Sequence, residues 1–279
     1  TLGFLIGFFV VDFGNVRLSE VLLLIVPPLI LAIVGLYDDI SNASASIRFL
    51  FQLASSSIVT FLFLKNGFFG SPSTNQLLNV MISVVWIVGV TNALNFIDNL
   101  DGGAGGIVVI ASATLFFSAQ INGQYLISAC AAMLFGATLG FLVWNLYPAR
   151  IYLGDAGALF LGSLIAALLV RLQPQTSTQS LAWAVPVLIM AVPILDTCVA
   201  VLSRLVRKVS PFQGGRDHIS HRLIRIGFSR RQAALSIWLL TLYFCVLSII
   251  SQFVQKSGSV ILIAASAISW LICFWVLFR

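Results

Sequence analysis

The sequence predicts an all-α protein built as one polytopic bundle of transmembrane helices. Hydrophobic residues make up 59% of its 279 residues and charged residues only 9%, and the mean hydropathy is +1.05. Soluble domains carry about 25% charged residues, so this composition excludes a soluble globule, a disordered chain and a coiled coil. Apolar runs as long as Val21 to Leu36 do not alternate in polarity, which excludes a transmembrane β-barrel.

Apolar stretches long enough to cross a bilayer, which takes about 20 residues, follow one another along almost the whole chain. Connections between them carry turn residues, as in Gly70-Ser71-Pro72-Ser73 and Asn122-Gly123. We expect one integral membrane domain over 1–279. Because Thr1 lies inside an apolar run, we expect a part of the protein upstream of it to be missing from the sequence. The ten expected spans are 2–14, 21–37, 47–64, 77–97, 103–121, 125–147, 151–172, 181–203, 233–254 and 259–278.

Lysine and arginine are divided unevenly between the two ends of these spans. One end holds Arg17, Lys65, Arg171 and Lys256. The other end holds Arg48, Arg150, Arg204, Arg207, Lys208, Arg216, Arg222, Arg225, Arg230, Arg231 and Arg279. The positive-inside rule places the richer end in the cytoplasm. The loop 204–231, with eight basic residues and one acidic residue, is therefore expected to be a cytoplasmic, substrate-binding loop.

Most of the acidic residues lie at or near that same end of the spans. They are Asp38, Asp39, Asp98, Asp101, Asp155, Asp196 and Asp217. Carboxylates at membrane depth are costly and usually functional. The first four follow the C-terminal ends of predicted helices, where the helix dipole disfavours an anion by about 0.3–1 kcal/mol. We expect a divalent metal ion or an arginine to compensate, with salt bridges to the basic loop or simple solvation as the alternative.

Two motifs place several of these acids close together. In Gly35-Leu36-Tyr37-Asp38-Asp39-Ile40, adjacent carboxylates can bind a metal ion or polarise a phosphate. In Asn92-Ala93-Leu94-Asn95-Phe96-Ile97-Asp98-Asn99-Leu100-Asp101-Gly102-Gly103, oxygen-bearing side chains recur every three residues at Asn95, Asp98 and Asp101. On a helix they share one sector. Such a set suits a hard cation or the polar edges of a nucleotide, although a polar helix end before glycine is the alternative.

Two further motifs lie later in the chain. Asp155 stands at an expected helix start in Tyr152-Leu153-Gly154-Asp155-Ala156-Gly157, where an N-cap and a metal ligand are equally good interpretations. Both histidines of the chain, His218 and His221, lie in the basic loop beside Arg216 and Arg222. No cysteine is near, so phosphate binding is a better interpretation than zinc. Acids and cations together at one membrane face suit a phosphoanhydride substrate bridged by Mg²⁺ and a lipid acceptor.

The four motifs GLYDDI, NALNFIDNLDGG, YLGDAGALFLG and RDHISHRL, in this order, resemble those of the polyprenyl-phosphate N-acetylhexosamine-1-phosphate transferases. The resemblance covers essentially the whole chain. It implies transfer of N-acetylglucosamine-1-phosphate from UDP-GlcNAc to a polyprenyl phosphate such as undecaprenyl phosphate, with release of UMP and a need for Mg²⁺ or Mn²⁺. This reaction starts cell-envelope polysaccharides such as lipopolysaccharide O-antigen or teichoic acid. The implied location is a prokaryotic cell membrane, with the active site facing the cytoplasm.

The resemblance also implies roles for individual residues. Asp38, Asp39 and Asp98 are expected to be catalytic, Asp155 and Asn95 to hold the metal ion, and Arg48 to bind the lipid phosphate. The residues expected to bind the nucleotide-sugar donor are Asp101, Arg216, His218, His221 and Arg222. The expected partners are UDP-N-acetylhexosamine, the polyprenyl phosphate and the lipid bilayer, without nucleic acid; a homodimer is left open.

The sequence departs from the family pattern in several places. Asn42 stands in the last place of the DDxxD motif, Ser220 where the middle histidine of HxHH often stands, and Asn99 where a glycine is common. The resemblance also implies an earlier span and a basic cytoplasmic loop that have no counterpart in the sequence. With that span, the full protein is expected to have eleven.

Three questions stay open at this point. The muramoyl-pentapeptide branch of the same family is an alternative, although its run of three histidines is missing here. A transporter with an acidic relay is an alternative from another class, but transporters usually place acids near the membrane midplane. The lipid phosphate is expected to attack the β-phosphorus directly, and a two-step route through an aspartyl intermediate is not excluded.

The orientation can be tested by thiol labelling. Ser210→Cys places a thiol in the loop 204–231, which the charge distribution assigns to the cytoplasm. An impermeant thiol reagent should label this variant only after the cells are permeabilised, with the unsubstituted protein as the background. Ready labelling in intact cells would reverse the orientation.

Overall fold

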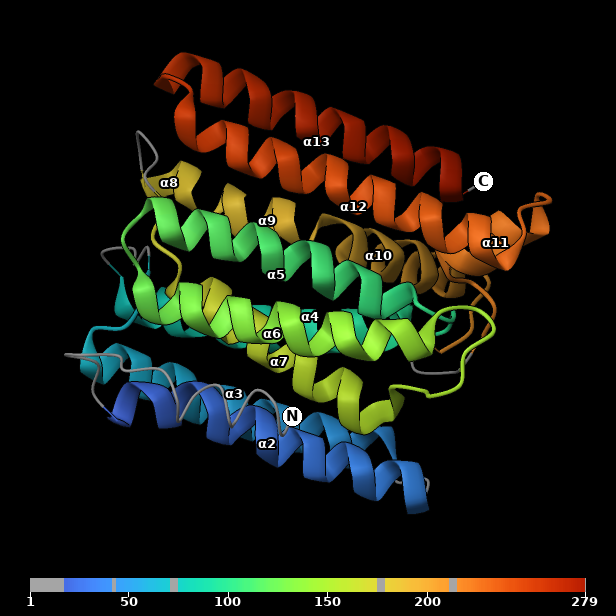
Figure 1. Cartoon of the computed structure of the whole chain (residues 1–279), viewed down its shortest axis with the longest axis horizontal. Helices are drawn as coiled ribbons and strands as arrows, with labels where there is room; N and C mark the ends of the chain where they lie inside the picture. Colours follow the sequence, from blue (N-terminus) through green and yellow to red (C-terminus); the bar gives the residue numbers. More distant parts are fainter. Residues whose placement is uncertain (1–17, 42–43, 71–74, 175–178, 211–214, 279) are drawn as a thin grey trace.

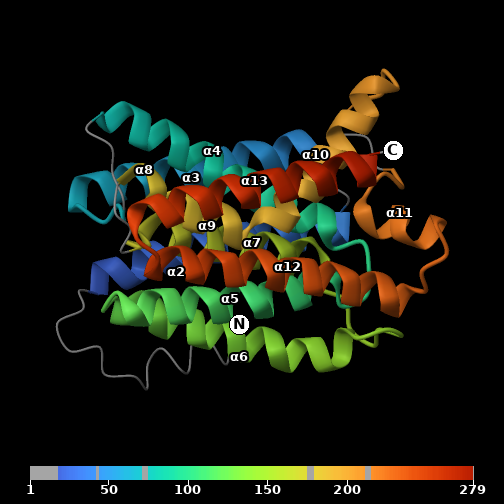
Figure 2. The same ribbon diagram turned by 90° about the horizontal axis from the view of Figure 1, so that it is seen from above.

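The computed structural model describes residues 18–41, 44–70, 75–174, 179–210 and 215–278. Within these ranges the chain is helical and contains no strand. The long helices run side by side along the longest axis of the molecule (Figure 1), and the view from above shows that they form several layers (Figure 2). The expected all-α bundle is confirmed. The expected span 2–14, Asn42 and Arg279 lie outside the described residues.

Eight of the described helices are long and apolar enough to cross a membrane. They correspond to eight of the expected spans. They are α2 (Leu18–Ser41), α3 (Ala45–Asn66), α4 (Gln76–Ile97), α5 (Gly103–Ile121), α6 (Tyr125–Asn145), α7 (Gly154–Arg171), α12 (Arg230–Phe253) and α13 (Lys256–Phe278).

The expected span 181–203 is not one continuous helix. It is divided into α8 (Gln179–Ala182), α9 (Ala184–Ile189) and α10 (Ala191–Val206). Pro186 and Pro193 lie in α9 and α10, and a proline has no N–H to give to the carbonyl four residues earlier. The chain then continues into the short helix α11 (Ile219–Arg225), which lies at the same end of the molecule as the C-terminus (Figure 1).

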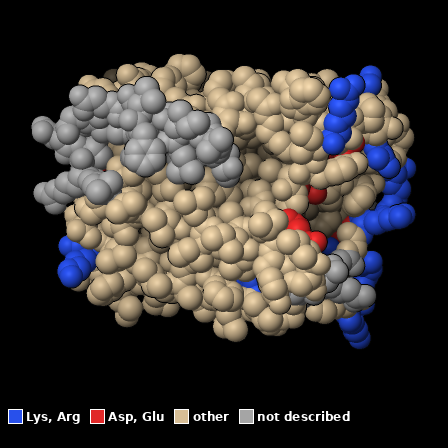
Figure 3. Space-filling model, turned by 60° about the horizontal axis from the view of Figure 1, so that its bottom comes forward, with Lys and Arg blue, Asp and Glu red and all other residues tan. Residues whose placement is uncertain are grey.

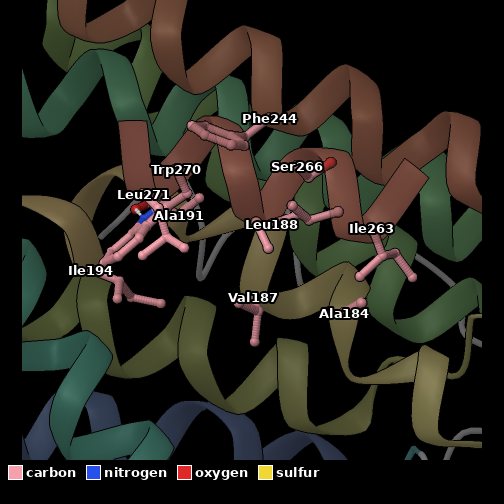
Figure 4. A pocket seen from close by; sticks show the side chains of 11 residues that line it. Ala184, Val187, Leu188, Ala191, Ile194, Phe244, Ile263, Ser266, Trp270 and Leu271 are labelled. Atoms are coloured by element: carbon pink, nitrogen blue, oxygen red, sulfur yellow. Dashed lines mark hydrogen bonds between the residues drawn. The ribbon is translucent and has the colours of Figure 1, made fainter. Parts of the chain in front are cut away.

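Side chains from neighbouring helices bond carbonyl groups at this interruption. The thiol of Cys245 on α12 donates to the carbonyl of Ile189 at 3.9 Å, which is the carbonyl that Pro193 cannot bond. The indole Nε1 of Trp270 on α13 donates to the carbonyl of Ala191 at 3.0 Å. Figure 4 shows the apolar cavity of about 410 Å³ that these helices enclose beside the interruption.

Helix α7 is the most enclosed of the long helices, because every residue from Ala158 to Arg171 is buried. Glycines allow its neighbours to approach closely. A Cβ atom at Gly162 would lie 2.8 Å from the Cα of Thr91 on α4, and one at Gly35 on α2 would lie 2.5 Å from the carbonyl carbon of Asp155. The N-terminal end of α7 is thereby held between α2 and α4.

The Gly162 contact predicts a specific loss of stability. Gly162→Ala forces α4 and α7 apart and should lower the stability by about 1–3 kcal/mol, the usual cost of overpacking. The measurement is the thermal midpoint of the detergent-solubilised protein. Gly136→Ala on α6 is the matched control, because a Cβ there meets no atom within 4 Å. Equal midpoints for the two variants would contradict the close packing.

Candidate active site at the acidic end of the bundle

The acidic residues gather in a hollow at the end of the molecule where most Lys and Arg also lie (Figure 3). Asp39, near the end of α2, reaches the first turn of α7. Its Oδ1 accepts a hydrogen bond from the N–H of Asp155 at 2.9 Å, and its Oδ2 accepts one from the N–H of Ala156 at 3.1 Å. The N-cap residue of α7, Leu153, makes no side-chain cap of its own. Asp39 therefore caps α7, and the expectation that Asp155 could be the cap is wrong.

This cap depends on a glycine. Gly154 has a φ of +65°, a left-handed conformation that side chains other than glycine rarely adopt. A Cβ atom at Gly154 would also lie 2.7 Å from Oδ2 of Asp39. Glycine at this position lets the carboxylate of one helix reach the free N–H groups at the start of another, where an anion is favoured.

Asp155 itself is held by side chains from two other helices. Arg48 of α3 donates to Oδ2 of Asp155 and, at 2.5 Å, to Oδ2 of Asp38, which is buried. Asn95 of α4 donates through Nδ2 to Oδ1 of Asp155 at 2.7 Å. The expected compensation of the aspartate pair by an arginine is confirmed for Asp38. Four helices, α2, α3, α4 and α7, meet at this point.

A cavity of about 320 Å³ lies beside this network. Its lining is mostly polar and contains four carboxylates and three side-chain amides. The lining residues are Asp39, Asn95, Asp98, Asn99, Leu100, Asp101, Asn145, Tyr152, Leu153, Gly154 and Asp155.

Asp98 directly follows the last residue of α4 and lies close to three other carboxylates. Burial, and then the negative charges of Asp155, Asp101 and Asp39, raise the pKa of Asp98 to about 7. Carboxylates that repel one another in this way favour a cation between them.

The turn between α4 and α5 is clamped to the connection between α6 and α7. Asp101 accepts a hydrogen bond from the N–H of Ala149 at 3.0 Å. Asn145 accepts one from the N–H of Gly102 at 3.0 Å and donates to the carbonyl of Ile151 at 2.9 Å. Asn145 has no role in the sequence prediction, although a lone amide near the end of an apolar span is a detectable signal.

His218 lies in a separate, buried network next to the cavity. Its Nδ1 is 2.7 Å from Oδ2 of Asp196, which is 0% exposed, and its Nε2 is 3.3 Å from Nη2 of Arg204. A guanidinium can only donate, so Nε2 accepts and Nδ1 carries the hydrogen that is given to Asp196. Asp196 also accepts from the N–H of Ile219 at 2.6 Å. Asp196 is thus a residue of this network to which the sequence prediction gave no role.

Arg222 holds the basic loop to the rest of the bundle. Its guanidinium donates to four oxygens at 2.8–2.9 Å, namely the carbonyls of Asp217, Leu277 and Phe278 and the hydroxyl of Ser203. The structure therefore engages Arg222 in protein contacts rather than bringing it to the cavity.

The remaining loop residues differ in their surroundings. Asp217 pairs with Arg204 at 3.2 Å and with Arg207 at 2.5 Å. Burial raises the pKa of Asp217, but the two arginines outweigh this effect and hold the pKa below its ordinary value. Arg216 is exposed. His221 is partly exposed, and its ring centroid lies 6.5 Å from that of His218. Burial, together with the positive charge of Arg216, lowers the pKa of His221.

The cavity has the donor chemistry that Mg²⁺ prefers, namely carboxylate and amide oxygens. Among the described residues, no group of three or more His, Cys, Asp or Glu side chains is arranged to hold a metal ion.

Known proteins with similar sequences carry related names. A protein of Bacillus subtilis (strain 168), named as a probable undecaprenyl-phosphate N-acetylglucosaminyl 1-phosphate transferase, is 36% identical over 83% of this chain and 64% of its own length. The decaprenyl-phosphate N-acetylglucosaminephosphotransferase of Mycolicibacterium smegmatis is 30% identical over 76% of this chain and 58% of its own. A phospho-N-acetylmuramoyl-pentapeptide-transferase of Geobacillus sp. (strain WCH70) is 30% identical over 71% of this chain and 61% of its own.

The chain thus spans about three fifths of the length of these relatives, at 58–64%. The family model described as glycosyl transferase family 4 matches residues 21–173, which carry most of α2, all of α3 to α7 and every residue that lines the cavity. The eight long apolar helices and the bacterial relatives identify a multi-pass membrane protein. The chain belongs to glycosyl transferase family 4.

Proposed function

We propose that this protein transfers N-acetylglucosamine-1-phosphate from UDP-GlcNAc to a polyprenyl phosphate at the cytoplasmic face of the cell membrane. The products are polyprenyl-diphospho-GlcNAc and UMP. The observation that carries the proposal is the cavity with four carboxylates at the end of apolar helices, next to Arg48. The names of the Bacillus and Mycolicibacterium relatives, with a polyprenyl phosphate acceptor and an N-acetylglucosamine phosphate group, support the same reaction.

The proposed reaction is a displacement at phosphorus. An oxygen of the lipid phosphate attacks the β-phosphorus of UDP-GlcNAc and forms a new P–O bond. The bond from the β-phosphorus to the bridging oxygen breaks, and UMP leaves with that oxygen. The attacking phosphate is already ionised, so no general base is needed. The protein has to orient the two substrates and stabilise the negative charge on their phosphates.

The acidic cavity requires a cation before it can accept anionic substrates. We propose Asp155, with Asn95, as the protein ligands of Mg²⁺ or Mn²⁺, with Asp98 facing the same cavity. When bound, the ion would polarise the pyrophosphate and neutralise charge on the leaving phosphate. Asp39 keeps Asp155 in place by capping α7, and this assigns Asp39 a positioning role.

Arg48 is the proposed site of the lipid phosphate. Its side chain is partly exposed, and its neighbours on α3, Phe49 and Leu50, are exposed apolar residues. In a membrane these neighbours face lipid, so a phosphate anchored by a polyprenyl chain reaches Arg48 from the bilayer. The ion pair with Asp38 orients the guanidinium before the acceptor arrives.

The donor is proposed to lie between the cavity and the basic loop. Asp101 lines the cavity. Of the four loop residues expected at the donor, Arg216 is exposed and His221 is partly exposed, so these two are accessible to donor phosphates. His218 and Arg222 are already engaged in protein contacts and are proposed to hold the loop in place. The acids lie at one end of the helices rather than at mid-depth, which favours an enzyme over a transporter.

The metal ligand can be tested with Asp155→Asn. This variant keeps the shape of the side chain and removes its charge, so UMP release should fall by about a hundredfold or more, the range for losing a preorganised electrostatic contact. The measurement is Mg²⁺-dependent release of UMP from UDP-GlcNAc beside a thermal melt.

Glu20→Gln is the matched control for this variant. Glu20 pairs with Arg171 at the opposite end of the bundle, at 2.8 Å. It should keep normal turnover. If Asp155→Asn retains activity with unchanged Mg²⁺ dependence, the ion belongs to Asp39 or Asp98 instead.

The acceptor site can be tested with Arg48→Ala. Loss of a charged hydrogen bond to phosphate should raise KM for polyprenyl phosphate roughly 10- to 100-fold and leave KM for UDP-GlcNAc near its normal value. Lys65→Ala, an exposed cation at the other end of α3, should change neither constant. A rise confined to KM for the donor would move Arg48 to the donor site.

A further inference from the structure

Two residues without an assigned role, Asn99 and Ser220, contact each other across 121 positions of the sequence. The hydroxyl of Ser220, in the first turn of α11, donates to Oδ1 of Asn99. Ser220 is only 1% exposed, whereas Asn99 lines the acidic cavity. The contact therefore runs from the wall of the cavity into the interior beneath the basic loop.

Asn99 is held so that its oxygen faces Ser220. Its Nδ2 donates to the carbonyl of Phe96, near the end of α4, at 2.7 Å. An amide has one donating and one accepting side, so this bond leaves Oδ1 as the acceptor for the serine hydroxyl. The orientation of Asn99 is thus fixed by its own helix end before α11 is considered.

The start of α11 has a second attachment on its other side. Asp196 of α10 accepts from the N–H of Ile219 at 2.6 Å and bonds the ring of His218 at 2.7 Å. That attachment fixes α11 to α10. The bond between Asn99 and Ser220 fixes it to the turn that carries the cavity carboxylates.

The neighbours of the two residues show what this bond aligns. Asp98 precedes Asn99 in the cavity wall, and His221 follows Ser220 on the loop side. The hydrogen bond thus joins a segment that carries a cavity carboxylate to a segment that carries an imidazole of the basic loop. Asn99 and Ser220 are also two of the positions at which the sequence departs from the family pattern, and the structure shows that these two departures are partners.

We infer that Asn99 and Ser220 are positioning residues that lock the basic loop against the acidic cavity and thereby set the donor site. The locking of the loop follows from the hydrogen bond between Asn99 and Ser220 alone. Its consequence for the donor rests on the proposed function.

The first test does not depend on activity. Ser220→Ala removes the hydroxyl and should increase hydrogen–deuterium exchange in peptides covering 98–102 and 219–225 of the detergent-solubilised protein severalfold. Ser236→Ala is the matched control, because it removes a serine hydroxyl that bonds only its own helix carbonyl at Gln232 in the structure. Unchanged exchange in Ser220→Ala would overturn the lock.

The second test is a double-mutant cycle on turnover. Ser220→Ala and Asn99→Ala should each raise KM for UDP-GlcNAc about tenfold, in the range expected when a buried hydrogen-bond partner is lost. KM for polyprenyl phosphate should stay near the wild-type value. Because both changes break the same bond, the double variant should be no worse than either single variant.

Independent effects that multiply to about a hundredfold in the double variant would overturn the coupling. If the wild-type protein releases no UMP from UDP-GlcNAc, the proposed function fails. The exchange experiment then decides on the lock by itself.

Discussion

The placement of several carboxylates at the ends of apolar helices is the constraint on which the rest of this structure depends. An uncompensated anion in such a position is costly, and three of the acids are compensated in different ways. Asp38 is paired with Arg48, Asp39 with the N–H groups at the start of α7, and Asp101 with a backbone N–H of the next connection. Asp98 is left among other acids, which makes its surroundings the natural place for an added cation.

The cap of α7 by Asp39 changes how the helix dipole acts in this protein. At the end of its own helix, α2, an aspartate is disfavoured. Because Gly35 and Gly154 let α2 and α7 approach closely, the same carboxylate lies at the positive end of α7. Packing between the two helices thus converts an unfavourable position into a favourable one. The same contact places Asp155 at the cavity, so the site depends on the packing of α2 against α7.

The sequence was sufficient to predict the eight long helices and the end of the bundle at which the acids gather. For the compensation of the aspartate pair it left a metal ion and an arginine open, and it assigned Arg48 to the lipid phosphate rather than to Asp38. The interruption of 181–203 was not predicted, although the two prolines in that stretch are a readable signal. The capping of α7 was assigned to the wrong residue, because local spacing shows Asp155 at the helix start but not Asp39 arriving from another helix. Asn145, Asp196 and the pair of Asn99 and Ser220 act through contacts between distant segments, which no spacing within one segment reveals.

The distance along the chain between Asp39 and its partners has a consequence for biosynthesis. The cap joins residues 116 positions apart, so α2 is made and inserted well before α7 exists. At about 5–20 residues per second, the ribosome needs roughly ten seconds to reach α7. During that interval Asp38 can already pair with Arg48, whereas Asp39 lacks the N-terminus of α7 and depends on interfacial water. Both aspartates lie in the last turn of α2 rather than at its middle. Water at the membrane surface can therefore solvate them, so α2 can insert before the rest of the site is synthesised.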